Sequence, residues 1–440
     1  NTTPRGPQRG PGQNQIASAV EPLIDSAARK LGLDPLEIRK INAVDNDGKV
    51  GGNQIPVTSA YMSNALDRGA ELFDWEQKRQ RSGDRNGSKV YGVGVGQAYH
   101  DCGRTGYDGL LVLTPDGKLH LHSGVGNLGT YSYVSTTRPA AEILKCDWGS
   151  CVVHQGTNTR HLPSASTQTG SNTSWTMTRT NYVAAMDALG KLKEIAAMDL
   201  GGAPEDYDIG DHKVFSKENP EQSLTYAEAA QRAIELGGKF SGEEPPEEIH
   251  EITKLAVAGI AGTGLVGVAK DTLRMDGDVP ALACGFAGVE VDLETGEVEL
   301  LDYVAVADCG TVLHPQGLGQ QLKGATVWGI GMALYERQIY DPQNGLPGNI
   351  GFEQCKPATY LDVPSTMQRS AVDIADPQNP VGSRGIGEPP MGAAAAAIVC
   401  AISDALDGHV FKRTPIVPDM IINHIAGREQ SNQPLQIHTA

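Results

Sequence analysis

The chain has 440 residues and a formal net charge of −17, with 53 glycines and only 5% aromatic residues. This length allows two or more subdomains and a large core. The acidic balance argues against nucleic-acid binding, because phosphate recognition requires a basic face. The glycine content predicts many tight turns and close approaches of the backbone.

The sequence predicts no membrane span and no cysteine-ligated metal. The longest weakly polar run, residues 255–269, is too short to cross a bilayer as a helix. The seven cysteines contain no Cys-x-x-Cys pair, which argues against a structural zinc or an iron–sulfur cluster in this chain. An odd number of cysteines, scattered along the chain, is typical of reduced thiols in a cytoplasmic protein. The sequence does not begin with a signal-peptide pattern. A leader on a segment outside this sequence is not excluded by that, so a periplasmic location stays open as an alternative.

The first predicted elements are two helices that follow a glycine- and proline-rich stretch. Residues 1–13 have the composition of a disordered tail. The next segment has apolar residues at the spacing of one helix face: Ile16, Val20, Leu23, Ile24, Ala27 and Leu31. A second helix begins at Asp34-Pro35, a cap and a first-turn proline. Because a fold seldom opens in this way, Arg9-Gly-Pro-Gly12 is interpreted as an internal loop whose preceding strand lies on another polypeptide.

Two similar hairpins organise the rest of the chain. One has the turn Thr114-Pro-Asp-Gly117 between strands at 110–113 and 118–122, and the other has the turn Glu294-Thr-Gly296 between strands at 288–293 and 297–301. Between them lie helices at about 181–200 and from Thr225, which begins a capping box with Glu228. The predicted fold class is α+β, with two related mixed α/β subdomains of mixed sheets and flanking helices. We expect an N-terminal helical segment at 1–90 and α+β units at 91–240 and 241–440.

Two loops before helices are candidate anion sites. Gly124-Val-Gly126-Asn-Leu-Gly129 matches a dinucleotide fingerprint by spacing. The acidic residue that should end the next strand is absent at Cys151-Val-Val-His-Gln155, so NAD binding is rejected and a turn with free backbone N–H groups remains. Residues 164–175 are rich in small hydroxyls, which fits either a helix cap or a phosphate-binding loop. His120 and His122 share a strand face but have no third ligand at a recognisable spacing, so a metal site there is not favoured.

The most specific stretch is Val381-Gly-Ser-Arg-Gly-Ile-Gly-Glu-Pro-Pro390. It places one carboxylate, Glu388, between a glycine run and two prolines, directly before the strong helix-forming residues 391–402. The prolines suit a first helical turn. A carboxylate in this position either caps the helix or takes part in catalysis.

Taken in their order along the chain, five segments resemble the molybdenum-cofactor subunit of the xanthine dehydrogenase and aldehyde oxidoreductase family. The resemblance rests on Arg9–Gly12 with its two helices, the loop 122–129, the loop 169–173, the helix start at 320–325 and Gly385–Pro390. It implies that 91–240 and 241–440 are the first and second cofactor-binding units. It also implies that Glu388, in the second, is the catalytic general base.

The same resemblance implies contacts with a molybdopterin cofactor, possibly in its cytosine dinucleotide form. These contacts come from Arg9, Asn127, Leu128, Gly129, Gly170, Ser171, Asn172, Thr173, Gln321 or its neighbour Gln320, and Gly387. No protein ligand to molybdenum is implied, because the pterin dithiolene holds the metal. Pro11 stands where many purine hydroxylases have phenylalanine, which puts xanthine in doubt. His100, Arg104 and Tyr107 are further candidate substrate contacts.

The implied function is a molybdenum-dependent hydroxylase or dehydrogenase subunit of a multi-subunit complex. It would add a water-derived hydroxyl to carbon in an N-heteroaromatic, aldehyde or other bulky small molecule. Electrons would pass to an iron–sulfur subunit with 2Fe-2S clusters and to a flavin subunit with FAD. The family's N-terminal part would come from a second molybdenum-subunit chain. Two alternatives stay open: a molybdenum-dependent hydratase or reductase on the same scaffold, and a non-catalytic assembly half.

Overall fold

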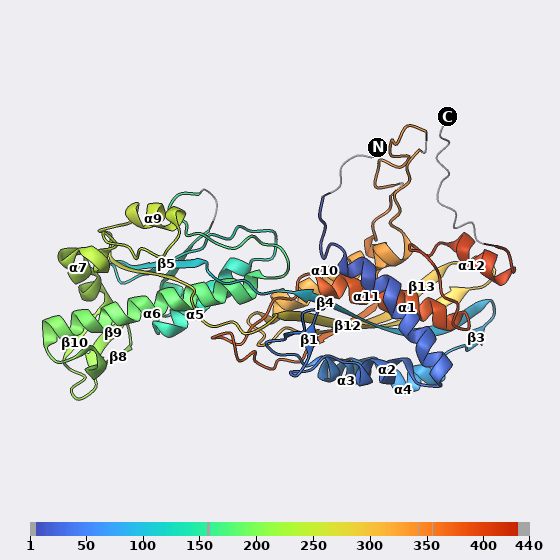
Figure 1. Ribbon diagram of the computed structural model, residues 1–440, viewed down its shortest axis with the longest axis horizontal. Helices are drawn as coiled ribbons and strands as arrows, with labels where there is room; N and C mark the ends of the chain where they lie inside the picture. The colour runs from blue at the N-terminus through green and yellow to red at the C-terminus, as the bar shows by residue number, and fades with distance from the viewer. Residues whose placement is uncertain (1–5, 156–158, 342, 354, 430–440) are drawn as a thin grey trace. The chain divides into compact units, whose positions relative to one another are not determined.

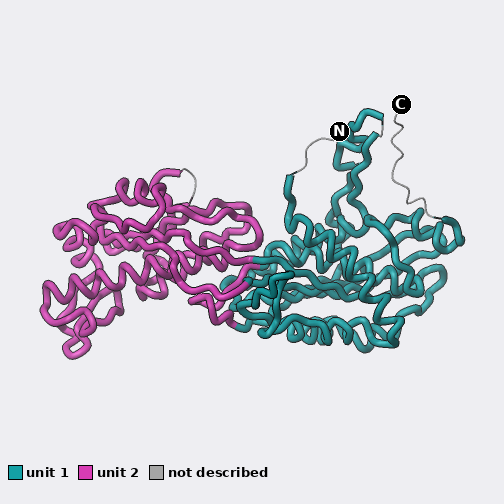
Figure 2. Tube along the Cα trace, in the orientation of Figure 1, with its two compact units in different colours: residues 1–101, 278–374, 386–440 teal, residues 102–277, 375–385 magenta. Residues whose placement is uncertain are grey.

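The computed structural model describes residues 6–155, 159–341, 343–353 and 355–429. It contains two units, coloured in Figure 2: unit 1 (1–101, 278–374 and 386–440) and unit 2 (102–277 and 375–385). These units do not follow the chain-order segments 1–90, 91–240 and 241–440. The reason is that β4 (Lys89–Asp101) pairs along its whole length with β12 (Pro280–Asp292), so the chain leaves one sheet and later returns to it.

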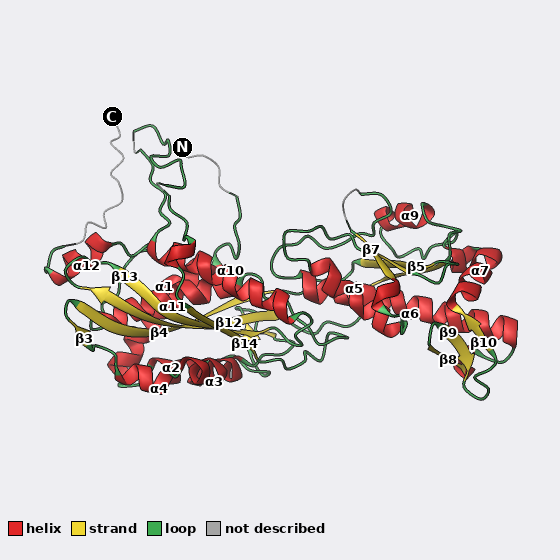
Figure 3. Ribbon diagram, turned by 180° about the vertical axis from the view of Figure 1, so that it is seen from behind, coloured by secondary structure: helices red, strands yellow, loops and turns green. Residues whose placement is uncertain are grey.

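Unit 1 is a five-stranded mixed sheet with helices on both faces (Figures 1 and 3). The strand order is β14 (Thr366–Ala371), β13 (Val298–Asp308), β12, β4 and β3 (Arg85–Asn86). β12 is antiparallel to β4 and β13, and β14 is parallel to β13. One face carries α1 (Gln13–Leu31), α10 (Pro315–Leu334) and α11 (Pro389–Ala405), and the other carries α2 (Pro35–Ile41), α3 (Met62–Phe73) and α4 (Trp75–Gln80). A small hairpin, β1 (Lys49–Val50) with β2 (Ile55–Pro56), and α12 (Pro418–Ile425) complete the unit.

The two faces of this sheet use different packing. Toward α3 and α4 the core is aromatic, and the rings of Phe73, Trp75 and Phe286 have centroids 5.7–6.2 Å apart. Toward α11, β4 presents glycines at alternate positions, 92, 94 and 96. A Cβ on Gly94 would lie 2.2 Å from the Ala397 carbonyl oxygen, so the backbones of strand and helix are in direct contact. This packing buries the alanine-rich α11 completely and fixes the position of its first residue.

Unit 2 contains a four-stranded sheet ordered β11 (Leu265–Lys270), β5 (Asp108–Leu113), β6 (Leu119–His122) and β7 (Cys151–His154). α5 (Ser132–Ile143) and α6 (Thr173–Leu200) pack with the side of β5 that carries Leu111 and Leu113. Leu110 and Val112 alternate with these residues and pack with α9 (Glu251–Ala258). A three-stranded sheet, β8 (Tyr207–Gly210), β9 (Lys213–Ser216) and β10 (Ser223–Thr225), precedes α7 (Tyr226–Leu236) and α8 (Gly238–Ser241).

The structure confirms the predicted fold class and its local elements. Both hairpins form, as β5–β6 and β12–β13. Thr225 and Glu228 make the predicted capping box. The helix predicted at about 181–200 begins earlier, at Thr173. Of the predicted tail, residues 1–5 lie outside the described residues, and helix α1 already begins at Gln13.

In the described part of the chain, no helix combines the length and the apolar character needed to span a bilayer. All seven cysteines lie in that part, and each is a free thiol.

Candidate active site

Glu388 is the residue that precedes α11, and its side chain is not used as a helix cap. Pro389 and Pro390 occupy the first helical positions. Within the described residues, the Glu388 carboxylate makes no hydrogen bond to the first turn of the helix. Its Oε1 instead accepts a hydrogen bond of 3.0 Å from the Gly10 backbone N–H, and the side chain is 13% exposed. The capping explanation of this carboxylate therefore fails.

Arg9 connects the loop before α1 with the two helices that flank Glu388. Its Nε donates to the carbonyl of Gly387, and its Nη2 donates to Gln321 Oε1 at 2.7 Å. Its guanidinium also lies over the Trp328 ring, 5.5 Å from the centroid. Burial lowers the pKa of Arg9, and the Glu388 carboxylate opposes this effect. Arg9 and Gln321 thus lie together beside the motif of Glu388, whereas Gln320 is exposed.

His100 provides a second polar neighbour of Glu388. It stands near the end of β4, and its Nε2 lies 3.6 Å from Glu388 Oε2. Its Nδ1 faces Asp101, 2.7 Å from the backbone carbonyl oxygen and 3.4 Å from Oδ1. Burial lowers the pKa of His100, but the Asp101 hydrogen bonds and the Glu388 carboxylate outweigh burial and raise it. The sequence marked His100 only as a possible substrate contact and gave no sign of this pairing.

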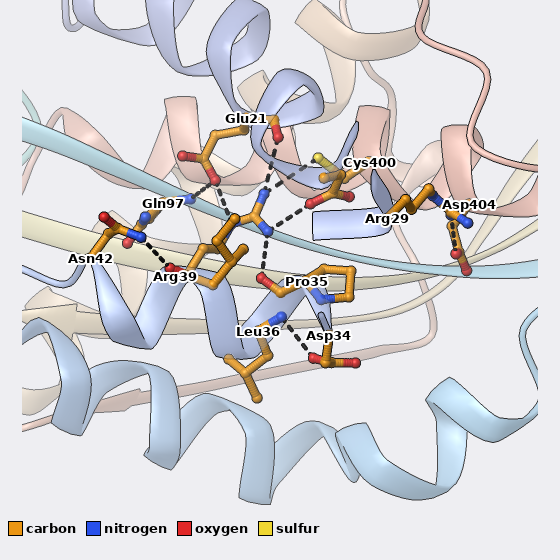
Figure 4. Close-up of polar contacts among 12 residues, drawn as sticks. Glu21, Arg29, Asp34, Pro35, Leu36, Arg39, Asn42, Gln97, Cys400 and Asp404 are labelled. Carbon is orange, nitrogen blue, oxygen red and sulfur yellow. Dashed lines mark hydrogen bonds and ion pairs between the residues drawn. The ribbon is translucent and has the colours of Figure 1, made fainter. Parts of the chain in front are cut away.

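A buried ionic cluster fixes α1 and α2 against this part of unit 1 (Figure 4). Arg39 donates to Glu21 Oε2 at 2.7 Å, to Asp25 Oδ1 at 2.6 Å and to the Pro35 carbonyl at 2.7 Å. Glu21 also accepts from the backbone N–H of Gln97 on β4. Burial raises the pKa of both carboxyl groups, and Arg39 opposes this effect. Glu21 and Asp25 stand four residues apart on α1, so their shared face was visible in the sequence.

The two predicted glycine loops belong to unit 2. In the first, Asn127 Oδ1 accepts from the Gly129 N–H at 2.9 Å, and Leu128 is 67% exposed. In the second, Gly170 and Ser171 have positive φ angles of 60° and 53°. A Cβ on Gly385 would lie 1.5 Å from the Ser171 carbonyl oxygen, so the loop 375–385 packs directly on this turn. Asn172 is buried, accepts a 2.6 Å hydrogen bond from Ser166 and precedes Thr173, the first residue of α6.

The chemistry of these loops fits an anionic cofactor. Although the chain is strongly acidic, residues 122–129 and 164–175 contain no carboxylate and present hydroxyls, amides and backbone N–H groups. Among the described residues, the buried hydroxyls of Ser123 and Ser383 have no hydrogen-bond partner. Neutral donors without a competing negative charge are the groups that a pterin phosphate requires.

The remaining predicted substrate contacts occupy different surroundings. Pro11 is exposed in unit 1. Arg104 and Tyr107 belong to unit 2. Arg104 is exposed and donates to the Gly103 carbonyl at 2.8 Å, and Tyr107 is half-buried.

A third histidine joins His120 and His122 in unit 2. His154 reaches them because β7 pairs in parallel with β6, and its ring stacks at 5.1 Å from His120 and 4.6 Å from His122. Burial, together with His154, lowers the pKa of His122 to about 4. In the described part of the chain, no three metal-ligating side chains have the geometry of a metal site.

Comparison with known proteins defines the class. The chain belongs to the molybdopterin cofactor-binding domain family: the family model of the second type matches residues 68–364, and the model of the first type matches residues 1–43. This confirms the family suggested by the sequence motifs.

Several of the relatives are named as molybdenum-binding subunits. Two examples from Escherichia coli (strain K12), each 27% identical, are the putative xanthine dehydrogenase molybdenum-binding subunit XdhA (97% of this chain, 54% of the relative) and the aldehyde oxidoreductase molybdenum-binding subunit PaoC (95% and 52%). The crystal structure of quinoline 2-oxidoreductase from Pseudomonas putida 86 matches with a TM-score of 0.77 at 26% identity, over 97% of this chain and 54% of that one. The chain therefore spans about half the length of the curated relatives that it matches.

Proposed function

We propose that this chain is the base-bearing part of a molybdenum hydroxylase, with Glu388 as the general base. The observation that carries the proposal is the orientation of Glu388, whose carboxylate is held by the Gly10 N–H and lies beside His100 instead of capping α11. A carboxylate fixed at one oxygen keeps the other oriented for proton transfer. Similar proteins also include a nicotine 6-hydroxylase large subunit from Paenarthrobacter nicotinovorans, besides the quinoline and aldehyde enzymes. N-heteroaromatic compounds and aldehydes are therefore the substrate classes that we propose.

In this proposal the cofactor is molybdopterin or its cytosine dinucleotide form. When bound, it supplies the centre that accepts two electrons from the substrate. Arg9, Gln321 and Gly387 of unit 1 would contact it, with Gln320 as the alternative to Gln321. In unit 2 the contacts would be Asn127, Leu128, Gly129, Gly170, Ser171, Asn172 and Thr173. His100, Pro11, Arg104 and Tyr107 are proposed substrate contacts.

Glu388 would take up the proton released as a water-derived oxygen is transferred to the substrate carbon. The Glu388 carboxylate, with Oε1 near the Gly10 N–H and Oε2 3.6 Å from His100 Nε2, is the proposed proton acceptor. His100, whose imidazole lies 3.6 Å from the carboxylate and is oriented by Asp101, would help to hold Glu388 in position during this step. Arg9 would hold the Gly387 carbonyl and thereby the direction in which the loop presents the carboxylate.

The proposed partners are a second molybdenum-subunit segment, an iron–sulfur subunit with 2Fe-2S clusters and a flavin subunit with FAD. Support comes from the relatives' names and from the half-length match. We place the complex in the cytoplasm, which the free thiols support.

The test is Glu388→Gln in the complex isolated from its source, with Glu71→Gln as an exposed control in unit 1. We expect unchanged molybdenum and pterin contents and a loss of substrate-dependent dye reduction by about 10²–10⁴-fold, the range for loss of a general base. The control should keep full activity. Retained turnover in Glu388→Gln would remove the assignment, and absence of molybdenum from the wild-type complex would overturn the whole proposal.

A further inference from the structure

Helix α1 buries several polar side chains and leaves four large apolar side chains exposed. Ile16, Val20, Leu23 and Leu31 are 63%, 43%, 57% and 67% exposed. The residues that α1 buries on the opposite side include four with polar side chains: Asn14, Ser18, Glu21 and Asp25. In a helix of a complete domain the apolar stripe normally faces the core. Such an exposed stripe marks an interaction surface.

The orientation of α1 is fixed by contacts that a rotation of the helix would break. Glu21 and Asp25 are the partners of Arg39, whose side chain is fully buried. Turning the apolar stripe inward would leave that guanidinium without its carboxylates in the core, which is strongly unfavourable. Asn14 Nδ2 also donates to the Arg9 carbonyl in the loop before the helix, a contact that a rotation of α1 would break. The outward position of the stripe is therefore a property of the fold.

We infer that this stripe, Ile16, Val20, Leu23 and Leu31, is the docking surface for the remainder of the first-type molybdopterin cofactor-binding domain. Two different models of the molybdopterin cofactor-binding domain match two parts of the chain. Residues 1–43 match the first-type model, and residues 68–364 match the second-type model. Two helices, α1 and α2, are too little to form a domain core of their own. The curated relatives that this chain matches are about twice as long as the chain.

The dimensions of the stripe suit a core contact. From Ile16 to Leu31 it extends for about 22 Å along the helix, at about 1.5 Å per residue. This length can pack against a helix or several strands of a partner segment. The inference rests on the partner part of the proposed function and names the surface that this partner covers.

A photo-cross-linker introduced in place of Leu23 tests the contact in the complex isolated from its source. We expect the cross-linked peptide to come from a sequence that matches the first-type domain model, and the mass of the product tells whether that sequence lies on a separate polypeptide or on the same one. The control position is Leu255, which is 75% exposed on α9 of unit 2. Cross-linking of position 23 to a second copy of this chain, to an iron–sulfur or flavin subunit, or to nothing would overturn the inference.

A pair of matched double variants gives a quantitative test. Val20→Glu with Leu23→Glu should reduce recovery of the first-type domain segment by at least about tenfold, the effect of losing a buried apolar anchor. Ile252→Glu with Leu255→Glu, an exposed pair of the same spacing on α9, should leave recovery unchanged. Thermal unfolding of the purified chain should be the same for both variants, because the side chains are exposed. Undiminished recovery of the segment with Val20→Glu/Leu23→Glu would overturn the inference. Because this experiment does not measure turnover, such a result would leave the role proposed for Glu388 untouched.

Discussion

Glu388 and His100 lie close together in space although they are far apart in the sequence. Glu388 precedes α11, and His100 lies near the end of β4. The carboxylate is held on one oxygen by the Gly10 N–H, while the imidazole is oriented by Asp101. Arg9 lies beside this pair and donates to the Gly387 carbonyl. Arg9 and His100 therefore both lie near the Glu388 motif, and the pKa of His100 depends on Asp101 and on the Glu388 carboxylate.

We predict that His100→Gln removes a pH-dependent part of the stability of unit 1. The pKa of His100 is raised above its ordinary value of 6.5. A raised folded-state pKa gives stability that is fully present below about pH 6.5 and is lost as the pH rises through the folded-state pKa. Urea unfolding of the purified chain over this range should show the wild type losing its advantage over His100→Gln as the pH increases. Parallel pH profiles of the two proteins would contradict the assignment.

At the scale of elements, the contact between β4 and α11 determines where Glu388 lies. Three alternate glycines let the helix backbone rest on the strand. The backbone N–H groups of Gln97 and Val93 on β4 donate to the carboxylates of Glu21 and Asp404. Because β3 pairs only with Lys89 and Val90 of β4 in the described structure, side chains from α1 and α11 satisfy backbone groups farther along this side of β4.

Replacement of Gly94 by alanine should therefore disturb both stability and catalysis. Its Cβ would lie 2.2 Å from the Ala397 carbonyl oxygen and 2.3 Å from the Ala401 nitrogen, so the helix must move. We expect a destabilisation of about 1–3 kcal/mol, typical of overpacking, and a lower turnover number because the start of α11 shifts.

The matched control is Gly324→Ala on α10, where an added Cβ meets nothing within 4 Å among the described residues. An alanine in a helix interior should stabilise by up to about 1 kcal/mol. Thermal unfolding and dye-reduction assays on both variants provide the comparison. Equal behaviour of Gly94→Ala and Gly324→Ala would show that the close packing of β4 and α11 has no role in placing the base.

Elements defined by local turn chemistry could be predicted from the sequence, and long-range pairings could not. The turns at 114–117 and 294–296 and the capping box at Thr225 act within a few residues and form as expected. The pairing of β4 with β12 and the approach of His154 to His122 depend on contacts that no local pattern encodes. The periodicity of α1 gave the helix, but a buried partner, Arg39, decided which face points inward.

The candidate site divides in the same way. Glu388, Arg9 and Gln321, or its neighbour Gln320, could be predicted as site residues because their motifs resemble a known family in order and spacing. The neighbourhood of Glu388 and His100 requires the end of β4 to be placed beside the loop before α11, which only the folded sheet shows. Whether the glycine loops of unit 2 hold the cofactor stays a prediction that mutation of Asn127 and Ser171 can address.

At the scale of the whole molecule, the pKa shifts of the histidines differ between the two units, so the stabilities of the units should depend differently on pH. In unit 2, burial lowers the pKa values of His120, His122 and His154, with that of His122 at about 4. In unit 1, the raised pKa of His100 and the lowered pKa of His409 act in opposite directions. Acidification should therefore weaken unit 2 more than unit 1.

We predict that the two units unfold separately at about pH 4.5, with unit 2 unfolding first. A histidine with a depressed pKa contributes stability that is present above the ordinary value of 6.5 and is lost as the pH falls toward about 4. For His122 this loss is on the order of 2–3 kcal/mol. Calorimetry at neutral and acidic pH, with hydrogen exchange to assign each transition, measures the separation. In His122→Asn, the unfolding temperature of unit 2 at acidic pH should move back toward that of unit 1. If acidification lowered the unfolding temperatures of both units equally in the wild type, the prediction would be wrong.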